Sequence, residues 1–198
     1  MKLFHAPRSR STRVLWLCEE LGIEMEVVPA SLTNPTAEFL ALNPSNTVPV
    51  FVDGDTVMTE SLAILMYLAK RHGPTPLLVR SGEPAFPDFL QFFILGEAGL
   101  LAPLNAAIGT KFSAPDAEKD NFTNRAIAQG FGNRVKLVER QLEKHQYMAA
   151  DRFTLADISV AFAIGVGASF LGFPISATVA DYQKRMTERP AFGRAAAR

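Results

Sequence analysis

The stretch from residue 43 to residue 68 constrains the fold more than any other, because it combines a hairpin signal with a helix start. Val50–Asp53 is a short apolar run, and the Gly54 that follows accepts the positive φ that a tight turn needs. Thr56–Thr59 can pair back on the first run. Ser61 then opens an apolar helix and is a good N-cap residue. The sequence therefore predicts a β-hairpin that leads directly into a helix N-terminus.

The residues before the hairpin predict two further strands and two helices. Lys2–His5 reads as a strand, and Ser11–Leu21 as a helix with apolar residues at helical spacing and Gly22 as its C-cap. Glu24–Val28 alternates as a second strand, and Pro35–Leu42 as a short helix. Two parallel strands joined by a helix, followed by a hairpin and a helix, give a thioredoxin-like α/β domain with a mixed sheet.

Four prolines between residues 74 and 87 predict a linker, so we expect one domain over residues 1–73 and another over residues 88–198. The second domain reads as helical throughout. The predicted fold class is therefore an α/β thioredoxin-like N-terminal domain followed by an all-α C-terminal domain. Ser113–Lys144 is predicted as one long helix that Gly130 or Gly132 kinks or divides.

Two further features of the second half concern helices. Thr154 and Asp157 have the spacing of a capping box at the start of a helix. Residues 158–180 carry no charge over a length that could span a bilayer, but glycines, Pro174 and hydroxyl residues interrupt the run. We therefore expect a buried core helix rather than a membrane span. A last helix over Asp181–Arg198 is expected to break at Pro190.

Composition excludes several classes of protein. Lys and Arg together number 20, as do Asp and Glu, so no global field favours nucleic acid or an anionic membrane as a partner. The one cysteine, Cys18, excludes a disulfide framework and a Cys-x-x-Cys redox or zinc pair, and no metal site is expected. A single unpaired thiol fits a reducing compartment, and the N-terminus lacks the apolar core of a signal peptide. A cytoplasmic location is therefore expected.

The hairpin region also suggests how a ligand would bind. Pro49 has no N–H and interrupts strand pairing. A cis Val48-Pro49 bond would turn the backbone of Val48 outward, where an extended peptide can pair with it. The N–H groups after Ser61 carry positive partial charge and suit a carboxylate. A small acidic peptide would fit both features, whereas the simpler interpretation is an ordinary hairpin and an ordinary capped helix.

The pattern N-P-x-x-x-V-P-V-F, a D-G turn and E-S-x-A-I-x-x-Y-L resembles the glutathione-binding half of the cytosolic glutathione transferases. The resemblance extends over nearly the whole chain. It implies glutathione as cosubstrate, a cis-proline at Pro49, and Val48 paired with the cysteinyl backbone of glutathione, with Thr47 beside it. It further implies that Glu60 and Ser61 hold the γ-glutamyl end. Members of this family are usually dimers, so a homodimer is also implied.

The first loop, Arg-Ser-Arg-Ser-Thr-Arg at residues 8–13, lies where thioredoxin-like folds place their reactive group. A helix N-terminus stabilises a thiolate there. This chain offers hydroxyls and no thiol, so it can activate a bound thiol but cannot exchange disulfides through cysteines of its own at this site. Relatives use Tyr, Ser or Cys at this position. No Tyr occurs in the first strand or loop, and Cys18 lies on the apolar face of its helix, where we expect it to be buried.

The serine type of the family therefore remains. Ser9 stands four residues before Arg13, which resembles the spacing in theta-like serine enzymes, and it is the first candidate for the catalytic hydroxyl. Ser11 is the second candidate and Thr12 the third, although one of these two is also expected to cap the helix. Arg10 and Thr12 are further candidates for contacts with glutathione.

Other positions bear on the substrates. Arg8, Arg10 and Arg13 either are solvated or attract the carboxylates of glutathione or of an acidic second substrate. The family often has a basic residue near Asn34 and Gly at Asn46, so this chain departs from it where the glycyl end of glutathione would bind.

The second, electrophilic substrate is expected between the first loop and the helix Asp88–Leu104, whose aromatic residues either line a pocket or belong to the core. The predicted activity is transfer of the activated thiol of glutathione to a small apolar or acidic electrophile. A glutathione-dependent isomerase or dehalogenase remains an alternative. A non-catalytic binding or interaction module of the same fold is another.

Overall fold

The computed structural model describes residues 1–198, which form two compact units. One unit comprises Met1–Thr75 together with Thr187–Arg198, and the other comprises Pro76–Met186. The boundary between Thr75 and Pro76 falls at the start of the predicted linker. The boundary between Met186 and Thr187 was not expected, because it assigns the C-terminal residues to the N-terminal unit.

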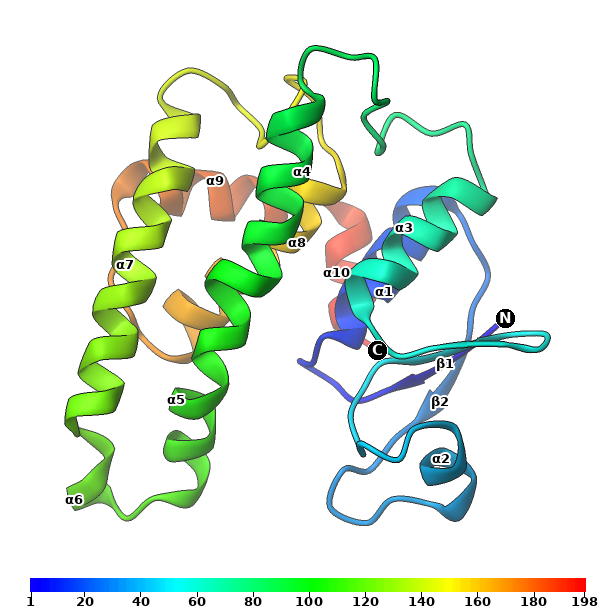
Figure 1. Ribbon diagram of the computed structural model, residues 1–198, viewed down its shortest axis with the longest axis horizontal. Coiled ribbons are helices and arrows are strands. Elements are labelled where there is room, and N and C mark those ends of the chain that lie inside the picture. The colour runs from blue at the N-terminus through cyan, green and yellow to red at the C-terminus, as the bar shows by residue number, and fades with distance from the viewer. The chain divides into compact units, whose positions relative to one another are not determined.

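The first unit contains a four-stranded mixed sheet in the order β2-β1-β3-β4 (Figure 1). β1 pairs in parallel with β2 and antiparallel with β3, and β3 pairs antiparallel with β4. This is the predicted thioredoxin-like layout. Its elements are β1 (Lys2–His5), α1 (Ser11–Leu21), β2 (Glu26–Pro29), α2 (Ala37–Leu42), β3 (Val50–Asp53), β4 (Thr56–Met58) and α3 (Ser61–Arg71).

Local chemistry explains where these helices begin and end. Gly22 adopts a φ of 65° and ends α1 as a left-handed C-cap, as the sequence predicts. α2 begins two residues later than predicted, because Thr36 is its N-cap and accepts a hydrogen bond from the N–H of Phe39. Val14, Trp16 and Leu17 on α1 are fully buried, and α1 packs beside α3. Burial of this apolar face holds α1, and therefore its N-terminus, on the sheet.

The C-terminal helix α10 (Pro190–Ala196) packs on α1 of the same unit (Figure 1). The rings of Trp16 and Phe192 meet edge to face with centroids 4.9 Å apart. Arg189 holds Glu20 through two contacts of 2.6 and 2.8 Å. These contacts explain why the last residues belong with the N-terminal unit rather than with the helical domain to which the sequence assigned them.

The second unit is helical, as predicted. A continuous helix runs from Phe86 to Ser113 and includes a π-helical segment with seven residues. The elements are α4 (Phe86–Ile94), η1 (Leu95–Leu101), α5 (Ala102–Ser113), α6 (Asp116–Lys119), α7 (Phe122–Leu142), α8 (Leu155–Ile164), η2 (Gly165–Phe170) and α9 (Ala177–Thr187), of which Thr187 falls in the first unit.

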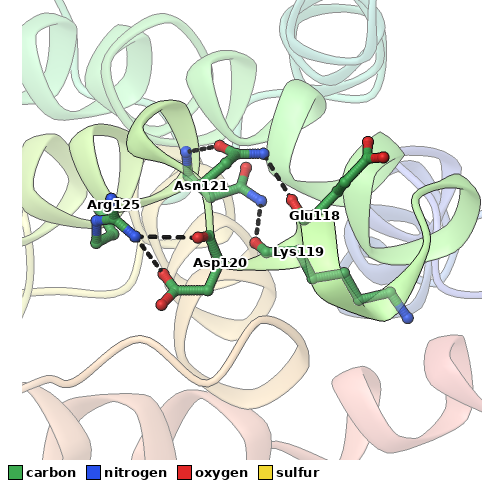
Figure 2. A network of polar contacts seen from close by, with 6 residues as sticks. Glu118, Lys119, Asp120, Asn121 and Arg125 are labelled. Carbon is green, nitrogen blue, oxygen red and sulfur yellow. Dashed lines mark hydrogen bonds and ion pairs between the residues drawn. The ribbon is translucent and has the colours of Figure 1, made fainter.

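The predicted helix over residues 113–144 breaks at a different place from the one expected. Gly130 and Gly132 lie inside α7, and the break falls before Asn121. Figure 2 shows the network that makes it: Asn121 accepts the N–H of Asn124 and donates to the carbonyl of Glu118. Arg125 donates to both the carbonyl and the carboxylate of Asp120. An asparagine N-cap thus starts α7, and the sequence analysis missed it.

Helix α8 is buried and begins with the predicted capping box. Thr154 accepts from the N–H of Ala156, and Asp157 accepts the N–H of Thr154 at 2.8 Å. The other carboxylate oxygen of Asp157 accepts from the N–H of Met148 and the hydroxyl of Tyr182. Burial raises the pKa of Asp157 to about 6, against hydrogen bonds that lower it. The box therefore joins α8 to two other segments of its unit.

The uncharged run over residues 158–180 does not form one helix. α8 and η2 end at Phe170, and α9 begins at Ala177. Another helix, Phe86–Ser113, is long and apolar enough to cross a membrane by length and composition alone. That is weak evidence, because core helices of soluble proteins pass the same test.

Candidate functional site

The loop between β1 and α1 carries the first set of candidate residues. Arg8 adopts a φ of 59°, and Arg10 occupies the N-cap position of α1 without a side-chain capping bond. Ser11 is therefore the first helical residue rather than the cap. The N–H of Ser11 instead donates to Ser9 Oγ at 3.3 Å. The hydroxyl of Ser9 thus lies beside the positive end of the α1 dipole.

The hydroxyls of Ser9 and Ser11 form a pair whose oxygens are 2.6 Å apart. Ser9 Oγ also donates to the carbonyl of Ala6 at 2.7 Å, and Ser11 Oγ contacts His5 Nδ1 at 2.7 Å. Ser11 and Thr12 are 0% and 5% exposed, whereas Ser9 is only half-buried. Of the three candidate residues, Ser9 is the only one that is not buried.

The arginines of this loop do not act as one cluster. Arg8 is exposed and Arg10 is half-buried, but Arg13 is fully buried. Arg13 Nη1 donates to Ser61 Oγ at 3.2 Å and so joins the N-terminal turns of α1 and α3. The sequence analysis missed this role. The sequence feature that could have indicated a buried Arg13 is its position directly before the apolar run Val14–Cys18.

Val48 and Pro49 stand immediately before β3 and are both buried. Their peptide bond is cis, as the resemblance implied. The ladder between β1 and β3 starts at Val50, so Val48 lies outside it. The backbone of Val48 is thus placed at the end of a strand and not within the sheet.

Asparagine side chains fix the loop that leads to Val48. Asn43 is buried and donates from Nδ2 to the carbonyl of Thr47 at 2.8 Å, while its Oδ1 accepts the N–H of Ser45. Asn46 adopts a φ of 52° and donates to the carbonyl of Leu32. Asn tolerates this left-handed conformation better than most residues, which explains how it stands where the family often has Gly. The sequence analysis did not identify Asn43.

The N-terminus of α3 holds the last two candidate residues. Glu60, and not Ser61 as predicted, occupies the N-cap position, without a side-chain capping bond. Ser61 is the first helical residue, and its side chain lies 3% exposed against Arg13. Glu60 itself is exposed. The N–H groups of the first helical turn have no partners within the helix, so this end of α3 suits a carboxylate.

Cys18 is not part of the site. It is 3% exposed, and burial raises the pKa of its thiol to about 12. This confirms the prediction of a buried core thiol. The structure thus places the loop at Ser9, the backbone of Val48 and the N-terminus of α3 in one unit, with no thiol of the protein among them.

Sequence comparisons identify the family. A family model described as the N-terminal domain of glutathione S-transferase matches residues 3–76. Glutathione S-transferase 3 of Zea mays is 31% identical over 170 residues, which cover 79% of this chain and 73% of that protein. A zeta class glutathione S-transferase of Euphorbia esula is 32% identical over 198 residues, which cover 96% of this chain and 81% of that protein. The chain belongs to the glutathione S-transferase family.

Solved structures agree on the fold. The ternary complex of BphK, a bacterial glutathione S-transferase, is 24% identical with a TM-score of 0.86 and covers 100% of this chain and 98% of its own. The glutathione S-transferase of Xylella fastidiosa is 20% identical with a TM-score of 0.85 and covers 98% and 96%. At these identities the likeness establishes the glutathione transferase fold. The sequence relatives confirm the family and enzyme class predicted from the residues around Val48-Pro49, and the solved structures confirm the fold.

Proposed function

We propose that this glutathione S-transferase binds glutathione in its first unit, lowers the pKa of the thiol through the hydroxyl of Ser9, and adds the sulfur to a small electrophile. One observation carries the proposal. Ser9 is the only one of the three candidate residues that is not buried, and its Oγ accepts the N–H of Ser11 at the N-terminus of α1. This is serine-type activation.

The energy that this requires is modest. A free thiol has a pKa of about 8.5, so only a few per cent is ionised at neutral pH. A depression of about two units makes thiolate the main species and corresponds to about 2.7 kcal/mol. A hydroxyl hydrogen bond to sulfur and the dipole of α1 both favour the thiolate. Once the thiolate forms, holding the electrophile beside it supplies most of the remaining acceleration.

The rest of glutathione would bind along the same unit. In this proposal the backbone of Val48 pairs with the cysteinyl residue, and Pro49 and Thr47 hold that backbone in place. The γ-glutamyl carboxylate lies at the N-terminus of α3, beside Glu60 and Ser61. Ser61 Oγ is already held by Arg13, so its N–H is the group offered to the ligand. Arg10 remains a candidate for a contact with glutathione. The side chain of Thr12 is buried, so in this proposal its role is structural.

We further propose that the protein is a cytoplasmic homodimer. Leu90 and Ile94 stand one helical turn apart on α4 and are 42% and 53% exposed. Large apolar side chains in such a row favour a protein partner over water. Arg8 is exposed in the first loop, which favours an electrophile that carries an acidic group.

The test is the pKa of the glutathione thiol in the complex, measured from its ultraviolet thiolate absorbance against pH. We expect a depressed pKa in the wild type and a return toward the free value in Ser9→Ala. Ser81→Ala, an exposed serine of the other unit, is the matched control and should behave as the wild type. Glutathione that binds with an unshifted thiol, or fails to bind, would refute the proposal and favour a non-catalytic module.

A glutathione-dependent isomerase is the second candidate, because the zeta class relative matches 96% of this chain. The transferase, isomerase and dehalogenase reactions need the same thiolate but differ in whether glutathione is consumed and whether halide is released. A transferase uses one glutathione for each product, whereas an isomerase regenerates it, and a dehalogenase releases halide. Assay of free thiol and halide during turnover separates the three reactions.

A further inference from the structure

His5 is the one titratable group that the hydroxyl pair contacts, and the proposed function does not use it. It ends β1, is 4% exposed, and has a partner on each ring nitrogen. Nδ1 lies 2.7 Å from Ser11 Oγ, and Nε2 lies 3.1 Å from the backbone carbonyl of Arg198. A continuous chain of contacts therefore runs from Arg198 through His5 and Ser11 to Ser9.

The partner of Nε2 determines which ring nitrogen carries the proton. The backbone oxygen of Arg198, the last residue of the sequence, only accepts hydrogen bonds, so Nε2 must be the donor. Burial lowers the pKa of His5, the hydrogen bond to the Arg198 carbonyl raises it, and the charge of Arg198 lowers it, with a net decrease. The lowered pKa favours the neutral ring at pH 7, and in that state Nδ1 accepts from the hydroxyl of Ser11.

This arrangement is one hydrogen short. Three close contacts need a hydrogen each: Ser9 to Ala6, Ser9 to Ser11, and Ser11 to His5. The two hydroxyls supply only two hydrogens while Nδ1 is unprotonated. A proton that enters at Ser9 and comes to rest on Nδ1 would supply the third hydrogen. His5 would then donate to Ser11, and Ser11 to Ser9.

We propose that His5 is a positioning residue that takes up the thiol proton of glutathione through the hydroxyls of Ser11 and Ser9. This inference rests on the proposed function. The S–H bond breaks and leaves its electron pair on sulfur. Ser9 Oγ gains that proton and passes one to Ser11 Oγ, which passes its own to Nδ1. The products are a thiolate and an imidazolium, and Ser9 keeps one hydrogen, which turns from the carbonyl of Ala6 to the sulfur.

Electrostatics favours this pair once the ligand is bound. While the bound thiol is neutral, burial disfavours the charged form of His5. A thiolate at Ser9 adds a negative charge, which raises the proton affinity of a nearby imidazole. The Arg198 carbonyl meanwhile keeps Nε2 as a donor in both protonation states. The proton would thus stay in the protein rather than pass to the solvent.

The experiment counts protons when glutathione binds to the full-length wild type at pH 7, by titration calorimetry in buffers of different ionisation heat. Thiolate absorbance is recorded in parallel. We expect thiolate to form with almost no proton released. S-Methylglutathione, which has no thiol proton, is the control ligand. With ¹⁵N-labelled histidine, NMR should show His5 as the neutral Nε2–H form alone, unchanged with this analogue, and as imidazolium with glutathione.

Asn in place of His5 can accept from Ser11 but cannot take up a proton. His5→Asn should therefore raise the thiol pKa by about one unit and lower kcat about ten-fold below that pKa, with KM for glutathione little changed. Any thiolate that it still forms should release one proton to the buffer. His145→Asn, at a partly exposed histidine of the other unit, is the control and should match the wild type.

The outcomes separate the two proposals. A full proton released for each thiolate in the wild type, or a neutral His5 in the glutathione complex, would overturn the role of His5 and leave Ser9 activation intact. A wild type that forms no thiolate would overturn both. If His5→Asn does not fold, the proton count and the NMR signal of the wild type still decide the question.

Discussion

Arg13 donates from Nη1 to Ser61 Oγ at 3.2 Å, and this contact links the starts of two helices that lie 48 residues apart in sequence. Both groups are buried. Ser61→Ala would remove one acceptor of a buried cation. We expect the free energy of unfolding to fall by about 1–3 kcal/mol, because this buried hydrogen bond is lost.

Urea denaturation measures this loss, and glutathione affinity should fall with it if the two helix starts must keep their spacing. Ser81→Ala, at an exposed serine, is the matched substitution and should change stability little. A Ser61→Ala protein as stable as the wild type would show that the contact contributes nothing.

Asn46 allows a second, more local prediction. Its φ of 52° disfavours residues with an ordinary Cβ, and its side chain also bonds Leu32. Asn46→Ala loses both advantages and should reduce stability by about 1–2 kcal/mol. Asn46→Gly keeps the backbone conformation and should lose less. Thermal unfolding of both variants decides, and an alanine variant at least as stable as the glycine variant would contradict the prediction.

The fold could be predicted from the sequence where the signals are local. Apolar spacing located α1, Gly22 ended it, and the Asp53-Gly54-Asp55 turn located the hairpin. The capping box at Thr154 and Asp157 was also visible, because both partners lie within one helical turn. In each case neighbouring residues alone determine the structure.

Other features depend on partners far along the chain and could not be predicted in this way. Arg13 reads as part of a basic loop until Ser61 is known to lie beside it. Similarly, the packing of Phe192 on Trp16, which draws α10 to the first unit, joins residues that no periodicity connects. Ser9 was proposed as a candidate from its spacing to Arg13, and the difference in exposure between Ser9 and Ser11 is seen only in the structure.

Gly96 lets η1 approach α8 closely in the helical unit. A Cβ added there would lie 2.3 Å from Ser159 Oγ and 2.6 Å from the carbonyl oxygen of Ser159. Because backbone cannot move aside cheaply, Gly96→Ala should destabilise the protein by about 3 kcal/mol or more. Gly109→Ala is a matched control, since a Cβ there meets nothing within 4 Å. It should stabilise the helix by about 0.4–1 kcal/mol. Equal unfolding midpoints for the two variants would refute this packing.

Asp157 should make stability depend on pH. Its pKa is raised from 3.8 to about 6 in the folded protein, chiefly by burial. Between these values the native state binds more protons than the unfolded state, so stability falls as pH rises from about 4 to about 6. The shift corresponds to about 3 kcal/mol over that window.

The measurement is the difference in unfolding free energy between the wild type and Asp157→Asn at a series of pH values. The variant cannot titrate at this position, so the difference isolates the carboxyl group. The wild type should lose stability relative to the variant as pH rises through the window, whatever the offset between them. Tyr182→Phe keeps the carboxyl group of Asp157 but removes a hydroxyl that donates to it and lowers its pKa. Stability should therefore still fall with rising pH in this variant, but over a window at higher pH. A difference that stays constant across pH would mean that the carboxyl of Asp157 titrates alike in the folded and unfolded chains.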